Sequence, residues 1–244
     1  MRLDRMIGHV TGESRRQVQE KIRKGQVGVG GVVVKDPGAE VKETDQISIM
    51  GRILDTRLTR HVMLYKPAGI LTAARDRKQK TVMDLLPPVY ASLACMPVGR
   101  LDRDTTGLLF LTTDGELSHR LLSPARHVDK CYRALVDGPV GEREVAMFRE
   151  GLDLGDFVTQ PSELEIEWSE EHAASCLLTI HEGKFHQVKR MFEKVGRTVT
   201  ELHRMTFGPL RLSGAPCGRV LQAGEYRELT DDEIRALYEA VDLA

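Results

Sequence analysis

The chain has 244 residues, of which 41% are hydrophobic and 29% charged, and its formal net charge at pH 7 is −1. This composition suits one large domain, or one domain with a small companion, and its apolar fraction is enough for a real core. No apolar run approaches the roughly 20 residues that span a membrane, and the N-terminus has no apolar signal region, so we expect a cytoplasmic protein with no membrane partner. The cysteines contain no CxxC pair and fit neither a zinc site nor a disulfide framework; they are Cys95, Cys131, Cys176 and Cys217.

Charge is distributed unevenly along the chain. Residues 1–25 carry a net charge of +4, residues 184–204 carry another +4 together with two histidines, and residues 225–244 are acidic. Two basic segments on a nearly neutral chain indicate an anionic partner that is contacted at two places, and nucleic acid is the natural candidate. Solvated helix faces are the alternative interpretation.

The first 50 residues predict a compact module of two helices and a hairpin. Apolar side chains recur with helical spacing in residues 2–10. Ser14 and Gln17 form a capping box that opens a second helix, and Gly25 closes that helix as its C′ residue. The glycine pair at 30–31 links two valine-rich strands and does not have the spacing of a phosphate-binding loop. The exposed side of the second helix is basic and carries Arg15, Arg16, Lys21, Arg23 and Lys24.

Beyond a predicted linker at residues 51–60, the pattern indicates an α+β domain on a mixed, mainly antiparallel sheet. The expected strands cover residues 61–65, 95–101, 108–112, 132–136, 163–168, 175–180 and 198–203. The expected helices cover residues 116–122, 141–151 and 184–195. Because helices occur only at intervals between the strands, a doubly wound sheet is not expected.

Asp102 lies between an arginine-bearing turn and the apolar run Leu108–Leu111. A carboxylate this close to a core is costly unless it is paired or used. A calcium loop that starts at Asp102 is excluded because Phe110 occupies its ninth position, where an oxygen ligand is required, and Thr113 its twelfth, where Glu is required. A turn or cap residue before the Thr-Thr-Gly sequence at 105–107 is the purely structural interpretation.

The segment 184–195 offers a partner for this carboxylate. Its apolar residues recur with helical spacing and indicate a helix docked on the core; they are Phe185, Val188, Met191, Phe192 and Val195. Lys189 would then project at the edge of the buried face and need a carboxylate partner, unless it extends to solvent. Arg190 and Lys194 would point further round, toward phosphates. Tyr132, at the start of a strand, is by itself a core or edge aromatic.

Four motifs of the chain, in this order, resemble those of pseudouridine synthases of the RsuA type. They are Gly99-Arg100-Leu101-Asp102 with Thr105-Thr106-Gly107-Leu108-Leu109, then Lys130-x-Tyr132, then Gly183–Met191, then Glu201–Arg204. Residues 1–56 resemble the S4-type RNA-binding domain that this family carries at its N-terminus, and residues 57–244 resemble its catalytic domain. Tyr65 stands where Asn is usual and Gly30 where Asp or Asn is usual, and neither belongs to the catalytic set.

The resemblance implies an isomerase that breaks the N-glycosidic bond of a uridine in ribosomal RNA, turns the uracil and rejoins it through C5, without cofactor or metal. Asp102 is then the essential carboxylate, Lys189 is the cation that keeps it ionised, and Tyr132 stacks on a base that has been flipped out of the RNA. The implied substrate contacts are Arg100, His186, Arg190 and Leu202. The expected RNA contacts of the N-terminal module are Arg2, Arg15, Arg16, Lys21 and Lys24.

The segments Asp104–Thr106 and Phe185–Lys189 resemble the small-subunit enzyme of the family more closely than its large-subunit relatives, which more often carry Arg where Lys189 stands. This implies uridine 516 of 16S rRNA as the target, in naked rRNA or in a small-subunit assembly intermediate, and a monomeric enzyme. A large-subunit (23S) rRNA pseudouridine synthase is the alternative within the family. A non-catalytic RNA-binding ribosome assembly factor is the alternative from another class, and the intact set of Asp102, Tyr132 and Lys189 argues against it.

Overall fold

The structure is a computed structural model that describes residues 1–212 and 220–243. The chain divides into two compact units. The first comprises Met1–Arg60, Leu86–Met96 and Thr112–Asp114, and the second comprises His61–Leu85, Pro97–Leu111 and Gly115–Ala244. The domain boundary expected after residue 56 stays a prediction. Within the described ranges, no helix is both long enough and apolar enough to cross a membrane.

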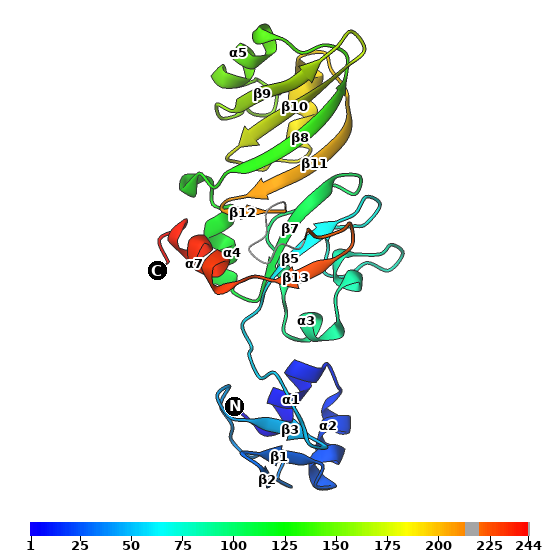
Figure 1. The fold of residues 1–244 in the computed structure, drawn as a ribbon, viewed down its shortest axis with the longest axis vertical. Helices are drawn as coiled ribbons and strands as arrows, with labels where there is room; N and C mark the ends of the chain where they lie inside the picture. Colours follow the sequence, from blue (N-terminus) through cyan, green and yellow to red (C-terminus); the bar gives the residue numbers. More distant parts are fainter. Residues whose placement is uncertain (213–219, 244) are drawn as a thin grey trace. The chain divides into compact units, whose positions relative to one another are not determined.

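The first unit contains the predicted pair of helices and the hairpin (Figure 1). Ser14 and Gln17 form both hydrogen bonds of the predicted capping box at the start of the second helix. Gly30 and Gly31 have φ angles of +57° and +81°, as the tight hairpin turn between two short strands requires. The elements are α1 (Leu3–Thr11), α2 (Arg15–Arg23), β1 (Val27–Val29), β2 (Val32–Val33), β3 (Ile47–Ile49), β4 (Arg52–Ile53) and α3 (Pro88–Ser92).

The predicted linker at residues 51–60 is wrong for its first half, because Arg52–Ile53 form the edge strand β4, antiparallel to β3. The rest of the segment is also attached to the unit. Thr56 Oγ1 donates a hydrogen bond of 2.6 Å to the carbonyl oxygen of Glu43, and Asp55 forms an ion pair with Arg60. A strand of two residues is too short to show an apolar alternation, so the sequence pattern could not reveal it.

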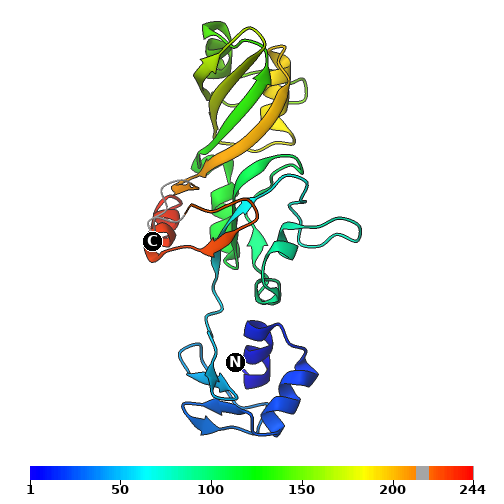
Figure 2. The ribbon, with the colours of Figure 1, turned by 45° about the vertical axis from the view of Figure 1, so that its right-hand side comes forward.

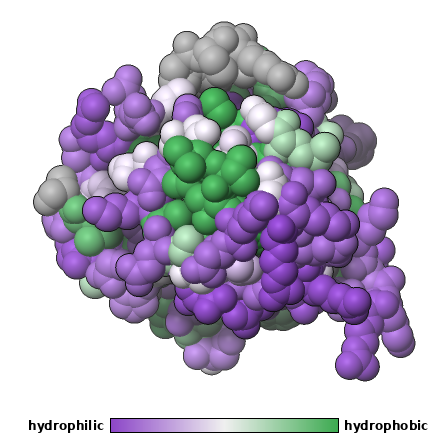
Figure 3. Space-filling model, turned by 90° about the horizontal axis from the view of Figure 1, so that it is seen from below, coloured by the Kyte–Doolittle hydropathy of each residue, from purple (hydrophilic) through white to green (hydrophobic). Residues whose placement is uncertain are grey.

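The sheet of the first unit has the strand order β2-β1-β3-β4 and buries one face against the helices. Its core is formed by Leu3, Met6, Ile7, Val18, Ile22, Val27, Val41 and Ile47. On the opposite face, Val33, Gly28, Ser48 and Ile53 lie side by side across the four strands, and Val33 and Ile53 are 58% and 60% exposed. A view from below shows hydrophobic side chains gathered in a patch among polar ones (Figure 3).

The second unit is built on a mixed sheet with the order β13-β5-β7-β11-β8-β10-β9, which confirms the expected fold class. Strands β7 and β11 are parallel, and β11, β8, β10 and β9 pair antiparallel. The strands are β5 (His61–Lys66), β6 (Met96–Pro97), β7 (Thr106–Thr112), β8 (Lys130–Asp137), β9 (Glu163–Ser169), β10 (Ala173–Ile180), β11 (Val199–Phe207), β12 (Leu210–Arg211) and β13 (Tyr226–Glu228). The helices are η1 (Val82–Leu85), α4 (Gly115–Leu122), η2 (Pro124–Arg126), α5 (Glu142–Glu150), α6 (Gln187–Lys194) and α7 (Asp231–Glu239).

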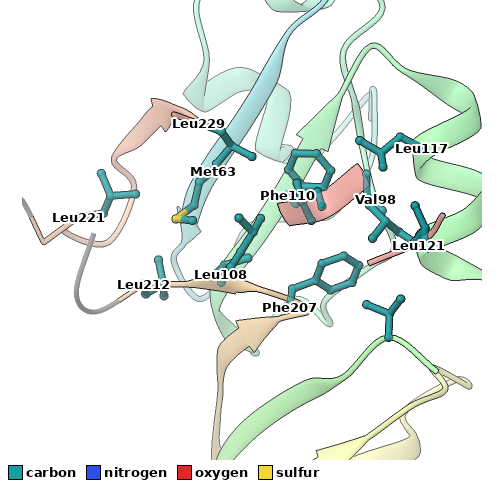
Figure 4. Close-up of a cluster of buried hydrophobic side chains, with 14 residues drawn as sticks. Met63, Val98, Leu108, Phe110, Leu117, Leu121, Phe207, Leu212, Leu221 and Leu229 are labelled. Atoms are coloured by element: carbon teal, nitrogen blue, oxygen red, sulfur yellow. The ribbon is translucent and has the colours of Figure 1, made fainter. Parts of the chain in front are cut away.

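Helices cover the sheet of the second unit in two places. Figures 1 and 2 show β11, β8, β10 and β9 side by side, with α6 against one face of these strands. Helix α5 joins α6 there, since the rings of Phe148 and Phe192 are 5.1 Å apart. Around β5, β7 and the end of β11, helices α4 and α7 contribute to a second apolar core that contains Phe110, Leu117 and Phe207 (Figure 4). Cys131 and Cys176 are free thiols of this unit, Cys95 is buried in the first unit, and Cys217 lies outside the described residues.

The predicted strand at residues 95–101 is wrong beyond Pro97. Only Met96–Pro97 form a strand, and Gly99 has a φ angle of +73°, which ends extended structure and begins a loop that reaches β7. This loop carries Asp102. Its far end is fixed by the parallel pairing of β7 with β11, where Gly107 lies opposite Arg204. A Cβ atom at residue 107 would be 2.3 Å from the carbonyl oxygen of Arg204, so only glycine fits.

Candidate active site

The second unit contains a cavity of about 740 Å³ that brings together most of the residues singled out from the sequence. Its walls come mainly from the loop with Asp102, residues 183–189 before and at the start of α6, residues 71–73, and the pocket-facing side chains of β8 and β11. Asp102, Tyr132, Lys189, Arg100, His186 and Leu202 all line it. These residues are up to 102 positions apart in the chain, so the sheet topology assembles the site.

The loop that carries Asp102 is held on both sides of this residue. Before it, Thr72 Oγ1 donates to the carbonyl oxygen of Leu101 at 2.8 Å and accepts from its amide at 3.2 Å. After it, the ammonium of Lys66 donates to the carbonyl oxygens of Arg103 and Thr105 at 3.2 and 2.8 Å. Both anchoring side chains are buried, so the loop is attached to the core rather than to solvent.

Asp102 is paired with the cation that its position predicted. Lys189 Nζ lies 3.3 Å from Oδ2 of Asp102, and His186 Nε2 lies 3.5 Å from Oδ1. The same ammonium donates to both carboxylate oxygens of Asp104, at 2.7 and 2.8 Å. Burial acts to lower the pKa of Lys189, but the hydrogen bond to Asp104 and the charges of both carboxylates outweigh it and raise the pKa. Lys189 is therefore a permanent cation shared by two carboxylates.

Helix α6 places Lys189 by docking its apolar face on the core. Val188, Met191 and Phe192 are buried, and Lys189 lies at the edge of this face with its side chain 20% exposed. The approach to the helix is fixed by Gln187, which is 3% exposed and donates to Glu182 while accepting from the amide of Lys184 at 2.9 Å. The predicted edge position of Lys189 is confirmed.

Phe185 is a correction to the sequence analysis, which placed it on the buried face of the helix. It precedes α6 and is 75% exposed. The intervening His186 has a φ angle of +50°, so the backbone turns there and the helical spacing does not extend back to Phe185.

Two neighbouring strands supply the floor of the cavity. Tyr132 on β8 lies directly opposite Arg204 on β11, and Ala134 lies opposite Leu202, so these side chains share one face of the sheet. Tyr132 is 7% and Leu202 is 8% exposed. Strand β8 alternates buried and accessible residues along its whole length, which keeps Tyr132 on the cavity side.

Three buried cations lie at the floor of the cavity or under the loop that carries Asp102, and none of them has a carboxylate partner among the hydrogen bonds of the described residues. Lys66 and Lys130 donate to backbone carbonyl oxygens, and Arg204 Nε donates to the carbonyl oxygen of Leu108 at 2.7 Å. Burial lowers the pKa of each lysine to about 8. Arg204 Nη2 is buried without a hydrogen-bond partner in the described part of the chain. The site is therefore strongly electropositive around Asp102.

The sequence analysis did not assign Lys66, Lys130 or Arg204 to the site. Lys130 and Arg204 lie within the quoted motifs, and their two-residue spacing from Tyr132 and Leu202 places them on the same strand face. Lys66 has a weaker signal, a single lysine at the end of an apolar strand.

Arg190 lies away from the cavity. Its guanidinium forms an ion pair with Asp156 through two nitrogens and donates to the carbonyl oxygen of Leu154 at 3.1 Å. Its charge also sits over the ring of Phe157, 5.3 Å from the centroid. This geometry fixes a loop against α6 and does not support the expected substrate contact.

In the first unit, most of the expected RNA-binding cations are already paired. Arg2 and Arg15 both contact the buried Asp4, at 2.9 and 3.4 Å, while Lys21 pairs with Glu13 and Lys24 with Glu20. Of the five, only Arg16 has no ion-pair partner within the described ranges. Arg5 and Arg23 were not in the expected set, yet they are equally exposed and unpaired in the described part of the chain.

Comparisons with known proteins match both units. A family model described as RNA pseudouridylate synthase matches residues 60–194, and a model of the S4 domain matches residues 1–47. An uncharacterized RNA pseudouridine synthase of Bacillus subtilis (strain 168) is 38% identical over 241 residues, covering 98% of this chain and 99% of the relative.

Two further relatives differ in the ribosomal subunit that their names give. Ribosomal small subunit pseudouridine synthase A of Vibrio cholerae is 37% identical over 240 residues, covering 98% of this chain and 100% of the relative. Ribosomal large subunit pseudouridine synthase B of Bacillus subtilis is 36% identical over 244 residues, covering 99% and 97%. A crystal structure of a pseudouridylate synthase aligns with a TM-score of 0.65 and 36% identity, covering 97% of this chain and 99% of that one.

Proposed function

This chain belongs to the RNA pseudouridylate synthase family, and we propose that it isomerises a uridine of ribosomal RNA with Asp102 as its essential carboxylate. The observation that carries the proposal is the position of Asp102 on the wall of the cavity, 3.3 Å from the ammonium of Lys189 and in the same cavity as Tyr132. A carboxylate, a cation beside it and a buried aromatic side chain are what the isomerisation needs in one place.

The reaction breaks the C1′–N1 bond of the uridine, turns the uracil and joins C5 to C1′. C5 then loses its proton and N1 gains one, so the product is an isomer of the substrate. Asp102 can add to the ribose, add to the base or take a ribose proton, and each of these steps requires the ionised carboxylate. Lys189 places its positive charge 3.3 Å from this carboxylate. Tyr132 stacks on the flipped uracil and stands beside the position from which the C5 proton is lost. Leu202 packs against the base, and Arg100 and His186 contact the RNA at the rim.

RNA would be bound at two places, the rim of the cavity and the first unit. The rim of the cavity is basic, and the first unit adds Arg2, Arg15, Arg16, Lys21 and Lys24. Four of these five already have carboxylate partners, so phosphates would have to compete with these acids, and Arg16 would bind phosphate at the lowest cost. Each phosphate contact releases counterions, so binding should weaken steeply with salt.

For the target, we propose uridine 516 of 16S rRNA, modified by a cytoplasmic monomer in free rRNA or a small-subunit assembly intermediate. The relative from Vibrio cholerae, with its small-subunit name, supports this choice. Uridine in 23S rRNA is the second candidate, favoured by the large-subunit relative at nearly the same identity.

Mapping pseudouridine in rRNA from cells with and without this protein tests the proposal. We expect one position to lose its pseudouridine, and Asp102→Asn should fail to restore it. Asp232→Asn is the matched control, since this carboxylate is 84% exposed on α7. A position in 23S rRNA would overturn the target, full restoration by Asp102→Asn would overturn the role of the carboxylate, and RNA binding without any modification would favour an assembly factor.

A further inference from the structure

Phe185 is an exposed aromatic side chain at the rim of the catalytic cavity. Its side chain is 75% exposed, although it lines the same cavity as Asp102 and Tyr132. Its ring stacks on the ring of His186 with a centroid distance of 3.8 Å and an interplanar angle of 18°. One face of the phenyl ring is therefore occupied, and the large remaining exposure leaves π-surface available to a ligand.

The backbone around Phe185 is fixed, so the ring is presented by built structure. Gln187 fixes the start of the segment with two hydrogen bonds. It accepts one from the amide of Lys184 at 2.9 Å and donates one to the carboxylate of Glu182 at 2.8 Å. His186 adopts a left-handed conformation with φ of +50°, which directs the chain into α6. A left-handed non-glycine residue costs free energy and is typical of functional sites.

We propose that Phe185, backed by His186, is a stacking platform for a nucleobase that neighbours the target uridine in the RNA chain. The inference rests on the proposed function and extends it to a second base. The target base occupies the floor beside Tyr132, whereas Phe185 lies at the exposed rim. When a uridine is flipped out, the adjacent base loses a stacking partner, and an aromatic face replaces it.

The charges around Phe185 favour RNA as the occupant. Lys184 precedes it, and the exposed Arg100 and Arg103 line the same cavity, so the RNA backbone on either side of a stacked base would meet cations. A phenyl ring has no hydrogen-bonding group. The platform therefore accepts any base and contributes affinity and positioning rather than sequence discrimination.

The platform is connected to the catalytic carboxylate through a single residue. His186 stacks on Phe185, and its Nε2 lies 3.5 Å from Oδ1 of Asp102. A base stacked on Phe185 would hold the imidazole in place beside Asp102. Phe185 is thus a positioning residue, and its loss should raise KM more than it lowers kcat.

Fluorescence of 2-aminopurine tests the platform without turnover. The probe replaces the base on the 5′ side or the 3′ side of the candidate target uridine in an rRNA segment that the wild-type protein binds. We expect the wild-type protein to quench one of these two positions. Phe185→Ala should abolish that quenching and weaken binding about 5- to 150-fold. Phe185→Trp should retain both, and Phe185→Leu should behave like Phe185→Ala.

Trp168→Ala is the matched control, because Trp168 is a partly exposed aromatic residue on β9 that does not line the cavity. Wild-type quenching and affinity in Phe185→Ala would overturn the platform. Because quenching and affinity need no reaction, failure of the wild-type protein to form pseudouridine in an RNA that it binds would count against the proposed function alone.

Discussion

Replacing Lys66 by methionine tests how the fold holds the loop that carries Asp102. Burial lowers the pKa of Lys66 from 10.5 to about 8, which corresponds to a cost of about 3 kcal/mol for the charged form in the folded protein. Methionine removes this cost. It also removes the donor to the carbonyl oxygens of Pro67, Arg103 and Thr105. Of these three, the carbonyl oxygen of Arg103 still accepts a hydrogen bond from the amide of Gly69, at 2.7 Å.

The two effects oppose each other in stability but not in activity. Two buried carbonyl oxygens that lose this donor cost about 1–3 kcal/mol each, so the free energy of unfolding at pH 7 should change by no more than about 3 kcal/mol. The loop that carries Asp102, however, loses its anchor. A displacement of about 1 Å is enough to lower kcat about 100-fold.

The same variant has a signature in the pH dependence of stability. Between pH 8 and 10.5 the unfolded chain holds the proton of Lys66 and the folded chain has released it, so wild-type stability rises with pH by up to about 1.4 kcal/mol per pH unit. Lys66→Met should lose this contribution in urea unfolding, whereas the exposed Lys78→Met should keep it. Unchanged kcat, or an unchanged rise above pH 8, would refute the reasoning.

Three further variants probe other parts of the structure. Gly107→Ala should destabilise the protein by several kcal/mol in thermal unfolding, because its Cβ would overlap the backbone of Arg204; a Tm within 2 °C of wild type would contradict this. Arg16→Ala should weaken RNA binding at all sequences and reduce the slope of log K against log salt by about one, and an unchanged slope would remove Arg16 from the interface. Asp104→Asn should lower the pKa of Lys189, because a hydrogen bond to Asp104 supports its charge, and activity should fall at a lower alkaline pH than in wild type; an unshifted alkaline limb would show that Asp102 alone sets the charge of Lys189.

Much of the fold could be predicted because local signals agree with the final structure. The capping box at Ser14, the double glycine at 30–31 and the alternation in β8 each specify an element without help from the rest of the chain. Short edge strands such as β4 and β13 have no such signal, since two or three residues form them only when a neighbouring strand is present. The C-terminal helix α7 does have a local signal, the capping box of Thr230 and Glu233, but the sequence analysis did not use it.

The residues of the candidate site also fall into those that the sequence could predict and those that it could not. The pairing of Asp102 with Lys189 followed from the cost of two charges near a core, and the structure contains it. Asp104 as a second partner, Lys66 as the loop anchor and Phe185 at the rim depend on loop conformation, which no periodicity describes. For Arg190 the sequence pattern was misleading. Charge patterning alone predicts that this cation contacts RNA, but in the structure it forms an ion pair with Asp156.

The contact between Gly107 and Arg204 has a consequence for the order in which the protein matures. The loop with Asp102 is complete early in the chain, but its far end is fixed only by a strand almost 100 residues later, and Lys189, Leu202 and Arg204 arrive on the same late segment. During synthesis, the N-terminal module can leave the ribosome and fold while the cavity does not yet exist. A nascent chain could therefore hold RNA well before it is able to modify it.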